Sequence, residues 1–226
     1  MTQGTSAGGR VLDSVLAQPE KRVLIALAGR MPAWVTPDHL TALGVAGAVM
    51  VFAGYVLSAL DANYLWLASL GLVINWFGDS VDGTLARVRK IERPRYGFFV
   101  DHTTDLLSQA LIAFGLGLSP YVRFDVACLV LISYYIAAAF TFIRRIVSGT
   151  LAIAYLGVGP TEVRAGILLL NAALYFFPPF PVLSTPVRLS SADLVVMTAA
   201  ALTILAVSVA AFNEWRRLAH DDPRPR

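Results

Sequence analysis

The segment GDSVDGTLARVRKIERPRYGFFVDHTTD, residues 78–105, carries four aspartates between two almost purely apolar stretches. Asp79 and Asp82 end the first apolar stretch at spacing i, i+3. Asp101 and Asp105 begin the second at spacing i, i+4, so each pair occupies one face of its helix. An aspartate inside a membrane helix costs up to about 2.5–3.5 kcal/mol and marks a functional site by default. The segment therefore predicts a site where two helix ends meet.

The rest of the chain is unusually apolar. Of its 226 residues, 57% are hydrophobic, and the mean hydropathy is +0.65. Soluble domains have a lower apolar fraction, whereas runs of about 20 apolar residues are typical of membrane helices. The sequence predicts an all-α, polytopic membrane protein with six spans, over His39–Leu60, Tyr64–Gly83, Phe99–Ser119, Val122–Ile146, Glu162–Leu183 and Ser191–Trp215.

The distribution of basic residues supports an even number of spans. With both termini in the cytoplasm, 16 of the 18 lysines and arginines lie on the cytoplasmic side, and only Arg123 and Arg188 lie outside. This bias is the one that orients membrane proteins. The net charge of +3 therefore indicates anchoring at anionic lipid and no nucleic-acid partner. We expect a multi-pass protein of the cytoplasmic membrane, with the four aspartates on the cytoplasmic side.

The segment Arg10–Met31 is too short and too charged to span a membrane, but its apolar residues repeat at helical spacing. It predicts an amphipathic helix lying in the interface. The first residues lack the apolar core of a cleavable signal peptide, and the single cysteine, Cys128, can form no internal disulfide. The expected domains are a cytoplasmic tail with the interfacial helix (1–36), a membrane domain (37–217) and a second tail (218–226).

Four carboxylates that converge in a low dielectric repel one another strongly. Divalent cations relieve this repulsion, and hard oxygen ligands suit Mg²⁺ or Mn²⁺. Two such ions make a clamp suited to phosphoryl transfer. Nearby, Gly83 and Gly97 allow a ligand to approach the backbone closely, and Arg87 presents a planar fork to phosphate. The local prediction is a metal-bound pyrophosphate between two helix ends.

The spacing D-x2-D-G-x2-A-R-x9-G-x3-D-x3-D, residues 79–105, resembles the signature of the CDP-alcohol phosphotransferases. This resemblance implies an integral membrane enzyme with six core helices, two metal ions and a homodimeric assembly. It also implies the reaction: a hydroxyl attacks the β-phosphate of a CDP-linked donor, and CMP leaves.

The resemblance implies roles for individual residues. Asp79, Asp82 and Asp101 are expected to bind the metal ions. Asp105 is expected to complete the metal site and to act as the general base, with Asp101 beside it in catalysis. The expected CDP site comprises Asp79, Gly83, Ala86, Arg87 and Gly97.

Further motifs narrow the family to one branch. VDHTTD, residues 100–105, WVTPDHLT, residues 34–41, and the pair VSGTL and TEVR are similar to motifs of choline and ethanolamine phosphotransferases. That branch implies CDP-ethanolamine or CDP-choline as donor and diacylglycerol as acceptor. The alternative is a CDP-diacylglycerol donor with a small alcohol such as inositol phosphate, glycerol phosphate or serine. A further alternative is a cation transporter, although it has no need of the glycine and arginine spacing.

Four residues keep two interpretations each, and Asp38 is a further possible site residue. Asn75 lies one turn before Asp79 and either faces the nucleotide or bonds a neighbouring helix. His102 either assists proton transfer or caps its helix. Glu162 either joins the site or is favoured by a helix dipole. Arg144 binds either phosphate or the membrane interface, and Asp38 replaces an asparagine of the choline branch.

Overall fold

The computed structural model describes residues 10–11, 17–148, 151–152, 159–183 and 188–222. Its helices confirm the prediction of a helical protein, with one short and six long helices in the described residues. The helices are α1 Ala17–Arg30, α2 Pro37–Leu57, α3 Tyr64–Arg89, α4 Pro94–Leu118, α5 Phe124–Ser148, α6 Pro160–Phe176 and α7 Ser191–Asp221. The described residues also form two short strand pairs. Strand β1 Arg10–Val11 pairs with β2 Leu151–Ala152, and β3 Pro181–Leu183 pairs with β4 Leu189–Ser190.

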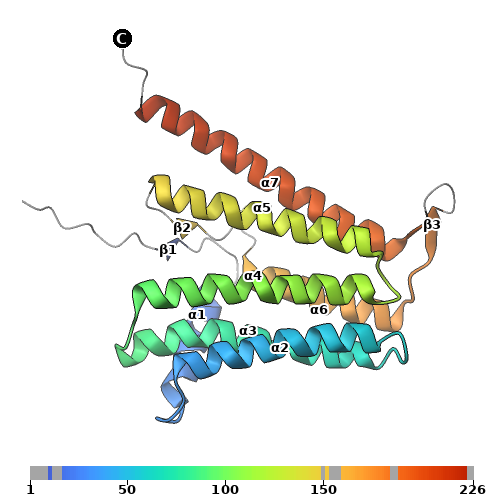
Figure 1. The fold of residues 1–226 in the computed structure, drawn as a ribbon, viewed down its shortest axis with the longest axis horizontal. Helices are drawn as coiled ribbons and strands as arrows, with labels where there is room; N and C mark the ends of the chain where they lie inside the picture. Colours follow the sequence, from blue (N-terminus) through green and yellow to red (C-terminus); the bar gives the residue numbers. More distant parts are fainter. Residues whose placement is uncertain (1–9, 12–16, 149–150, 153–158, 184–187, 223–226) are drawn as a thin grey trace, which may run out of the picture.

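The six long helices run roughly along the long axis of the molecule (Figure 1). Helix α2 packs on α3 and α4, α6 packs on α3, and α5 lies between α4 and α7. Helix α1 lies against α3 at the end of the bundle where α3 ends and α4 begins (Figure 1). Because α3 and α4 are joined by a short connection at this end, the four aspartates come to the same end of the bundle.

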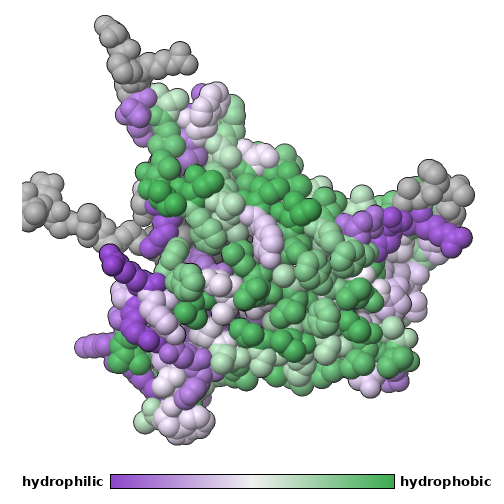
Figure 2. Space-filling model, in the orientation of Figure 1, coloured by the Kyte–Doolittle hydropathy of each residue, from purple (hydrophilic) through white to green (hydrophobic). Residues whose placement is uncertain are grey.

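Three helices, α2, α5 and α7, are long and apolar enough to cross a membrane. Helix α6 has 17 residues, and α3 and α4 carry the aspartates and several arginines, which lowers their hydropathy. Figure 2 shows apolar side chains over the middle of the molecule, with hydrophilic groups gathered at its two ends. This distribution is typical of a membrane protein.

Several boundaries differ from the sequence prediction: α3 continues to Arg89 beyond the expected Gly83, α4 begins at Pro94 rather than Phe99, and α7 ends at Asp221 rather than Trp215. The fifth apolar segment was expected to reach Leu183, but α6 ends at Phe176 because Pro178 and Pro179 follow and cannot continue a helix. Strand β3 takes the last residues of that segment. The N-terminal helix begins at Ala17 rather than Arg10, and residues 12–16 of the expected helix lie outside the described residues.

Helices α2 and α3 approach closely because glycines line their contact. A Cβ atom placed on Gly47 would lie 2.5 Å from the backbone nitrogen of Asn75 and 2.7 Å from the carbonyl oxygen of Gly71. A Cβ atom on Gly71 would lie 2.7 Å from the backbone nitrogen of Val51. Small residues at such contacts are how membrane helices gain packing energy. The same contact brings Asp79 close to α2, since its backbone nitrogen lies 3.3 Å from the Cβ position of Gly44.

A buried polar network ties α2, α3 and α6 together. The Tyr55 hydroxyl donates to Asn171 Oδ1 over 2.6 Å, and Asn171 Nδ2 donates to Ser69 Oγ over 3.1 Å. Tyr55 is fully buried, and Asn171 is 2% exposed. Asn171 therefore bonds neighbouring helices, as polar residues within membrane helices do by default.

Tyr55→Phe is expected to lower the free energy of unfolding by about 1 kcal/mol, because Asn171 Oδ1 then stays buried without a donor. The midpoint of unfolding in mixed detergent micelles measures this loss. The control Tyr175→Phe removes a tyrosine hydroxyl that donates to Asn63 at an exposed position. Its loss of unfolding free energy is expected to be less than about 0.5 kcal/mol. Equal losses for the two variants would contradict the importance of the buried network.

Arg89 fastens the connection between α1 and α2 to the end of α3. Its guanidinium donates to the carbonyl oxygens of Met31, Pro32 and Val35. On the inner face of α1, Ala28 packs with Val81 and other apolar residues of α3. Arg89 was expected only as a charge that orients the chain in the membrane, and it also holds α1 and α3 as one unit.

Candidate active site

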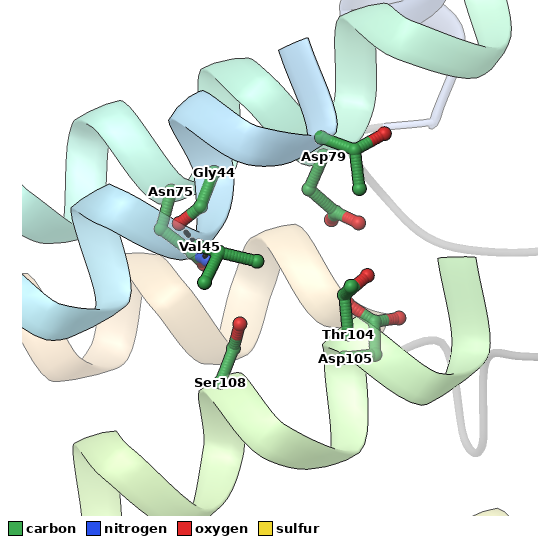
Figure 3. Close-up of a pocket in the computed structure, with 8 residues that line it drawn as sticks. Gly44, Val45, Asn75, Asp79, Thr104, Asp105 and Ser108 are labelled. Carbon is green, nitrogen blue, oxygen red and sulfur yellow. Dashed lines mark hydrogen bonds between the residues drawn. The ribbon is translucent and has the colours of Figure 1, made fainter. Parts of the chain in front are cut away.

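Three of the four aspartates meet. Asp79 lies on α3, Asp101 and Asp105 lie one turn apart on α4, and one carboxylate oxygen from each lies within 4.8 Å of the others. Figure 3 shows the side chains of Asp79 and Asp105 approaching each other from the two helices. The site therefore has the hard oxygen donors that Mg²⁺ and Mn²⁺ prefer.

The fourth aspartate, Asp82, is 7% exposed and turned toward α2. Its Oδ2 accepts a hydrogen bond from Thr41 Oγ1 over 2.6 Å, and its Oδ1 accepts from the backbone nitrogen of Gly83. Asp82 is thus outside the three-acid group, and its role as a metal ligand stays a prediction. Thr41 was not a candidate from the sequence, because only the packing of α2 on α3 reveals the contact.

Arg164 of α6 enters the acid group. Its Nη2 lies 2.7 Å from Asp79 Oδ2, and the residue is 6% exposed. From the sequence alone, a place in the site and a solvated helix start are equal explanations for Arg164, although an arginine one turn inside an apolar segment is itself a signal of a buried partner. Within this group three carboxylates face one guanidinium, which leaves an excess of negative charge among these side chains. This charge balance and the oxygen donors fit divalent cations.

A small cavity lies between α2, α3 and α4 beside the acids (Figure 3). The lining residues are Thr41, Gly44, Val45, Asn75, Asp79, Thr104, Asp105 and Ser108. Asn75 Nδ2 donates to the carbonyl oxygen of Gly44 over 3.0 Å, so the helix-bonding interpretation of Asn75 is observed. Its Oδ1 is buried and accepts no hydrogen bond within the described residues, which leaves an acceptor beside the cavity for a ligand.

The expected CDP-binding residues lie along the last turns of α3 and the first turn of α4. The Arg87 guanidinium donates to Thr84 Oγ1 over 3.0 Å, and a Cβ atom on Gly83 would lie 3.4 Å from it. A side chain at position 83 would thus be in van der Waals contact with this guanidinium. Ala86 is half-buried, and Gly97 is exposed with no atom within 4 Å of its Cβ position. Their role in binding CDP stays a prediction.

His102 lies beside the acids. Its ring packs between Phe98 and Phe142, with centroids 4.0 and 5.1 Å away. Nδ1 lies 2.9 Å from the Phe98 carbonyl oxygen and 3.4 Å from Asp101 Oδ2. A carbonyl oxygen can only accept, so we assign the proton to Nδ1. The guanidinium of Arg145 lies over the Phe98 ring, 4.6 Å from its centroid.

The remaining candidates have structural partners. Glu162 accepts from the backbone nitrogen of Gly159 over 2.9 Å and caps α6. Asp38 forms a two-oxygen ion pair with Arg93 on the surface. Arg144 lies 3.3 Å from Glu214 of α7, which also pairs with Arg217. Glu162 thus lies in the first turn of α6, where the helix dipole favours an acid, and no role in binding is tested for any of the three.

Comparison with known proteins adds a family match and two relatives. A sequence model described as CDP-alcohol phosphatidyltransferase matches residues 34–211. The archaetidylinositol phosphate synthase of Pyrococcus horikoshii is 37% identical over 121 residues, which are 53% of this chain and 61% of that protein. The phosphatidylinositol phosphate synthase of Cutibacterium acnes is 36% identical over 87 residues, or 38% and 39%. The matched part of this chain thus spans less than two thirds of either relative.

Proposed function

The chain belongs to the CDP-alcohol phosphatidyltransferase family, and we propose that it moves a phosphatidyl-type group from a CDP-linked lipid to inositol phosphate, with release of CMP. The chain is accordingly a membrane phosphotransferase, and a cation transporter is set aside. The observation that carries the proposal is the convergence of Asp79, Asp101 and Asp105 from α3 and α4, at the spacing that resembles the family signature.

Divalent ions, when bound, would neutralise the donor phosphates and draw charge from the reacting phosphorus. In the proposed site Asp79, Asp82, Asp101 and Asp105 hold these ions. Asp105 takes the proton from the acceptor hydroxyl as a general base. The hydroxyl oxygen forms a bond to the β-phosphorus of the donor, the bond from that phosphorus to the bridging oxygen breaks, and CMP leaves. Arg87 holds the donor phosphates over Gly83.

Two observations support inositol phosphate as the proposed acceptor. Both relatives are named as synthases of an inositol phosphate lipid, which favours the alternative of a small phosphorylated alcohol over the transfer of ethanolamine or choline to diacylglycerol. The ends of α5 and α7 also bring Arg144 and Arg217 to the same carboxylate, with Arg145 against the aromatic ring beside His102. These cations suit an acceptor that carries a phosphate.

A transfer assay with the full chain in detergent tests the proposal. Purified protein with Mg²⁺ is incubated with CDP-diacylglycerol or CDP-archaeol and inositol phosphate, and CMP and the lipid product are detected by mass. A second set contains CDP-choline or CDP-ethanolamine with diacylglycerol. We expect product only in the first set, and none in excess chelator. Product only in the second set would restore the choline and ethanolamine branch, and full turnover in chelator would contradict the metal ions.

Arg87→Ala is expected to raise the Michaelis constant for the CDP donor more than it changes stability. A hydrogen bond to a charged group is worth about 1.5–3 kcal/mol, roughly a 10- to 150-fold change in affinity. Donor titration followed by turnover measurement checks this. Arg95→Ala removes an exposed arginine nearby and is expected to leave the constant unchanged. An unaltered constant in Arg87→Ala would remove Arg87 from the donor site.

The proposed topology has six spans across the cytoplasmic membrane, with residues 37–217 as the catalytic domain and both termini and the site in the cytoplasm. In a Cys128→Ser background, Asp61→Cys lies in the α2–α3 connection and Glu92→Cys in the α3–α4 connection. We expect a membrane-impermeant maleimide to label Asp61→Cys in intact cells and Glu92→Cys only after lysis. The reverse pattern would invert the topology. A homodimer stays a prediction that light scattering tests.

A further inference from the structure

One carboxylate of the N-terminal helix joins three helices. Glu20 lies in the first turn of α1, and its Oε1 accepts a hydrogen bond from Trp76 Nε1 of α3 over 3.0 Å. The same oxygen accepts from Thr161 Oγ1 of α6 over 2.6 Å. An acidic residue is favoured in a first turn by the helix dipole alone. That explanation requires neither of the two donors, which come from helices distant in the sequence.

The two donors lie next to the acid group. Trp76 stands three residues before Asp79 on α3, and Thr161 stands three residues before Arg164 on α6. Asp79 and Arg164 form the buried ion pair described above, with 2.7 Å between Oδ2 and Nη2. Helices α3 and α6 are therefore joined twice at neighbouring turns, once through Glu20 and once through this ion pair.

Glu20 can fix α6 because α1 is itself fixed on α3. Ala28 and the apolar residues around it pack between the two helices, and Arg89 binds the carbonyl oxygens at the end of α1. Helix α6 lacks this attachment, and in the described chain its start is held by the Glu20 hydrogen bond and by the Arg164 ion pair. The position of Arg164 against Asp79 thus depends on a residue of α1.

We propose that Glu20 is a positioning residue, which holds the start of α6 so that Arg164 orients the Asp79 carboxylate for divalent ions. The inference rests on the proposed function for the use of these ions. Partners that orient a metal-binding carboxylate typically change metal affinity by about 10- to 100-fold when removed. Glu20 acts one step further away, through Arg164, so a smaller effect of about three- to tenfold is expected.

Binding of Mn²⁺ to the full chain in detergent, followed by the paramagnetic resonance signal of free Mn²⁺, tests the proposal without turnover. Glu20→Ala is expected to raise the half-saturating Mn²⁺ concentration about three- to tenfold. Glu20→Gln keeps an oxygen that accepts both hydrogen bonds and is expected to stay within about twofold of the parent. The control Lys21→Ala changes the neighbouring exposed residue and should bind Mn²⁺ as the parent does.

Thr161→Val removes one donor while keeping the side-chain shape, and it decides the question if Glu20→Ala does not fold. It should weaken Mn²⁺ binding, and combining it with Glu20→Ala should add nothing, since both break the same link. Parent-like binding in Glu20→Ala or Thr161→Val, tighter binding, or failure of Glu20→Gln to restore it would overturn the proposal. If the parent binds Mn²⁺ but makes no inositol lipid, the proposed acceptor is wrong, while the Mn²⁺ measurements still test the role of Glu20. A parent that binds no Mn²⁺ would overturn both.

Discussion

Replacing Asp105 by asparagine is expected to lower turnover by about 100- to 10,000-fold, the usual contribution of a general base. Asparagine keeps the shape and one oxygen ligand but cannot take the proton of the acceptor hydroxyl. Asp105 lies one turn beyond Asp101 on α4, beside the cavity that α2, α3 and α4 enclose. Titration of the CDP donor with Mg²⁺ present should therefore give near-parental affinity, and the loss should lie in the rate of transfer.

Asp82→Asn provides the contrast for Asp105→Asn. We expect it to weaken metal-dependent donor binding as well as turnover, because Asp82 would bridge both ions, and asparagine keeps only one of its two ligand oxygens. Its carboxylate is fixed by Thr41, so the substitution also disturbs the α2–α3 contact. If Asp105→Asn turns over near the parent rate, Asp105 is not the base. His102, whose ring lies beside Asp101, then becomes the next candidate.

Gly47→Ala is expected to give the second large effect, a loss of stability of about 3 kcal/mol, at the upper end of the range for overpacked cores. The added methyl group would lie 2.5 Å from the Asn75 nitrogen and 2.7 Å from the Gly71 carbonyl oxygen. Both atoms belong to the backbone, so no side-chain rotation relieves the clash and the helices must separate. Because Asp79 lies on the same contact, donor binding should weaken together with stability.

The matched control for this substitution is Gly166→Ala. Gly166 lies within α6, and no atom lies within 4 Å of its Cβ position. Alanine is favoured over glycine in a helix interior by about 0.5–1 kcal/mol, so the control should match or exceed the parent in stability. Midpoints of unfolding in mixed micelles compare the two variants. A stable, active Gly47→Ala protein would show that α2 and α3 do not pack through their glycines.

The sequence predicts the helices and the acid group because both are local patterns. Runs of apolar residues near the length of a membrane span mark the helices, and the spacing of Asp79, Asp101 and Asp105 places them on facing turns. The end of α6 was missed because the apolar run continues through Pro178 and Pro179. Hydropathy does not register that proline lacks the backbone N–H donor that a continuing helix needs.

The contacts that hold the site aspartates in place could not be predicted from the sequence. Thr41 reaches Asp82 across 41 residues, and Arg164 reaches Asp79 across 85. Nothing in the spacing of either residue points to its partner, because the pairing depends on how α2 and α6 rotate against α3. Glu20 was likewise indistinguishable from a residue favoured by the dipole of its own helix. Such partners follow from packing, which sequence periodicity does not encode.

The attachment of Arg89 to the carbonyl oxygens of Met31, Pro32 and Val35 bears on how the chain is assembled during synthesis. These groups are separated by more than fifty residues, yet α2 and α3 run in opposite directions and return Arg89 to the side where the chain entered. The first three helices can thus dock as soon as Arg89 has left the ribosome. The later helices would then pack against these three, and α4 and α6 would bring the remaining charged groups of the site.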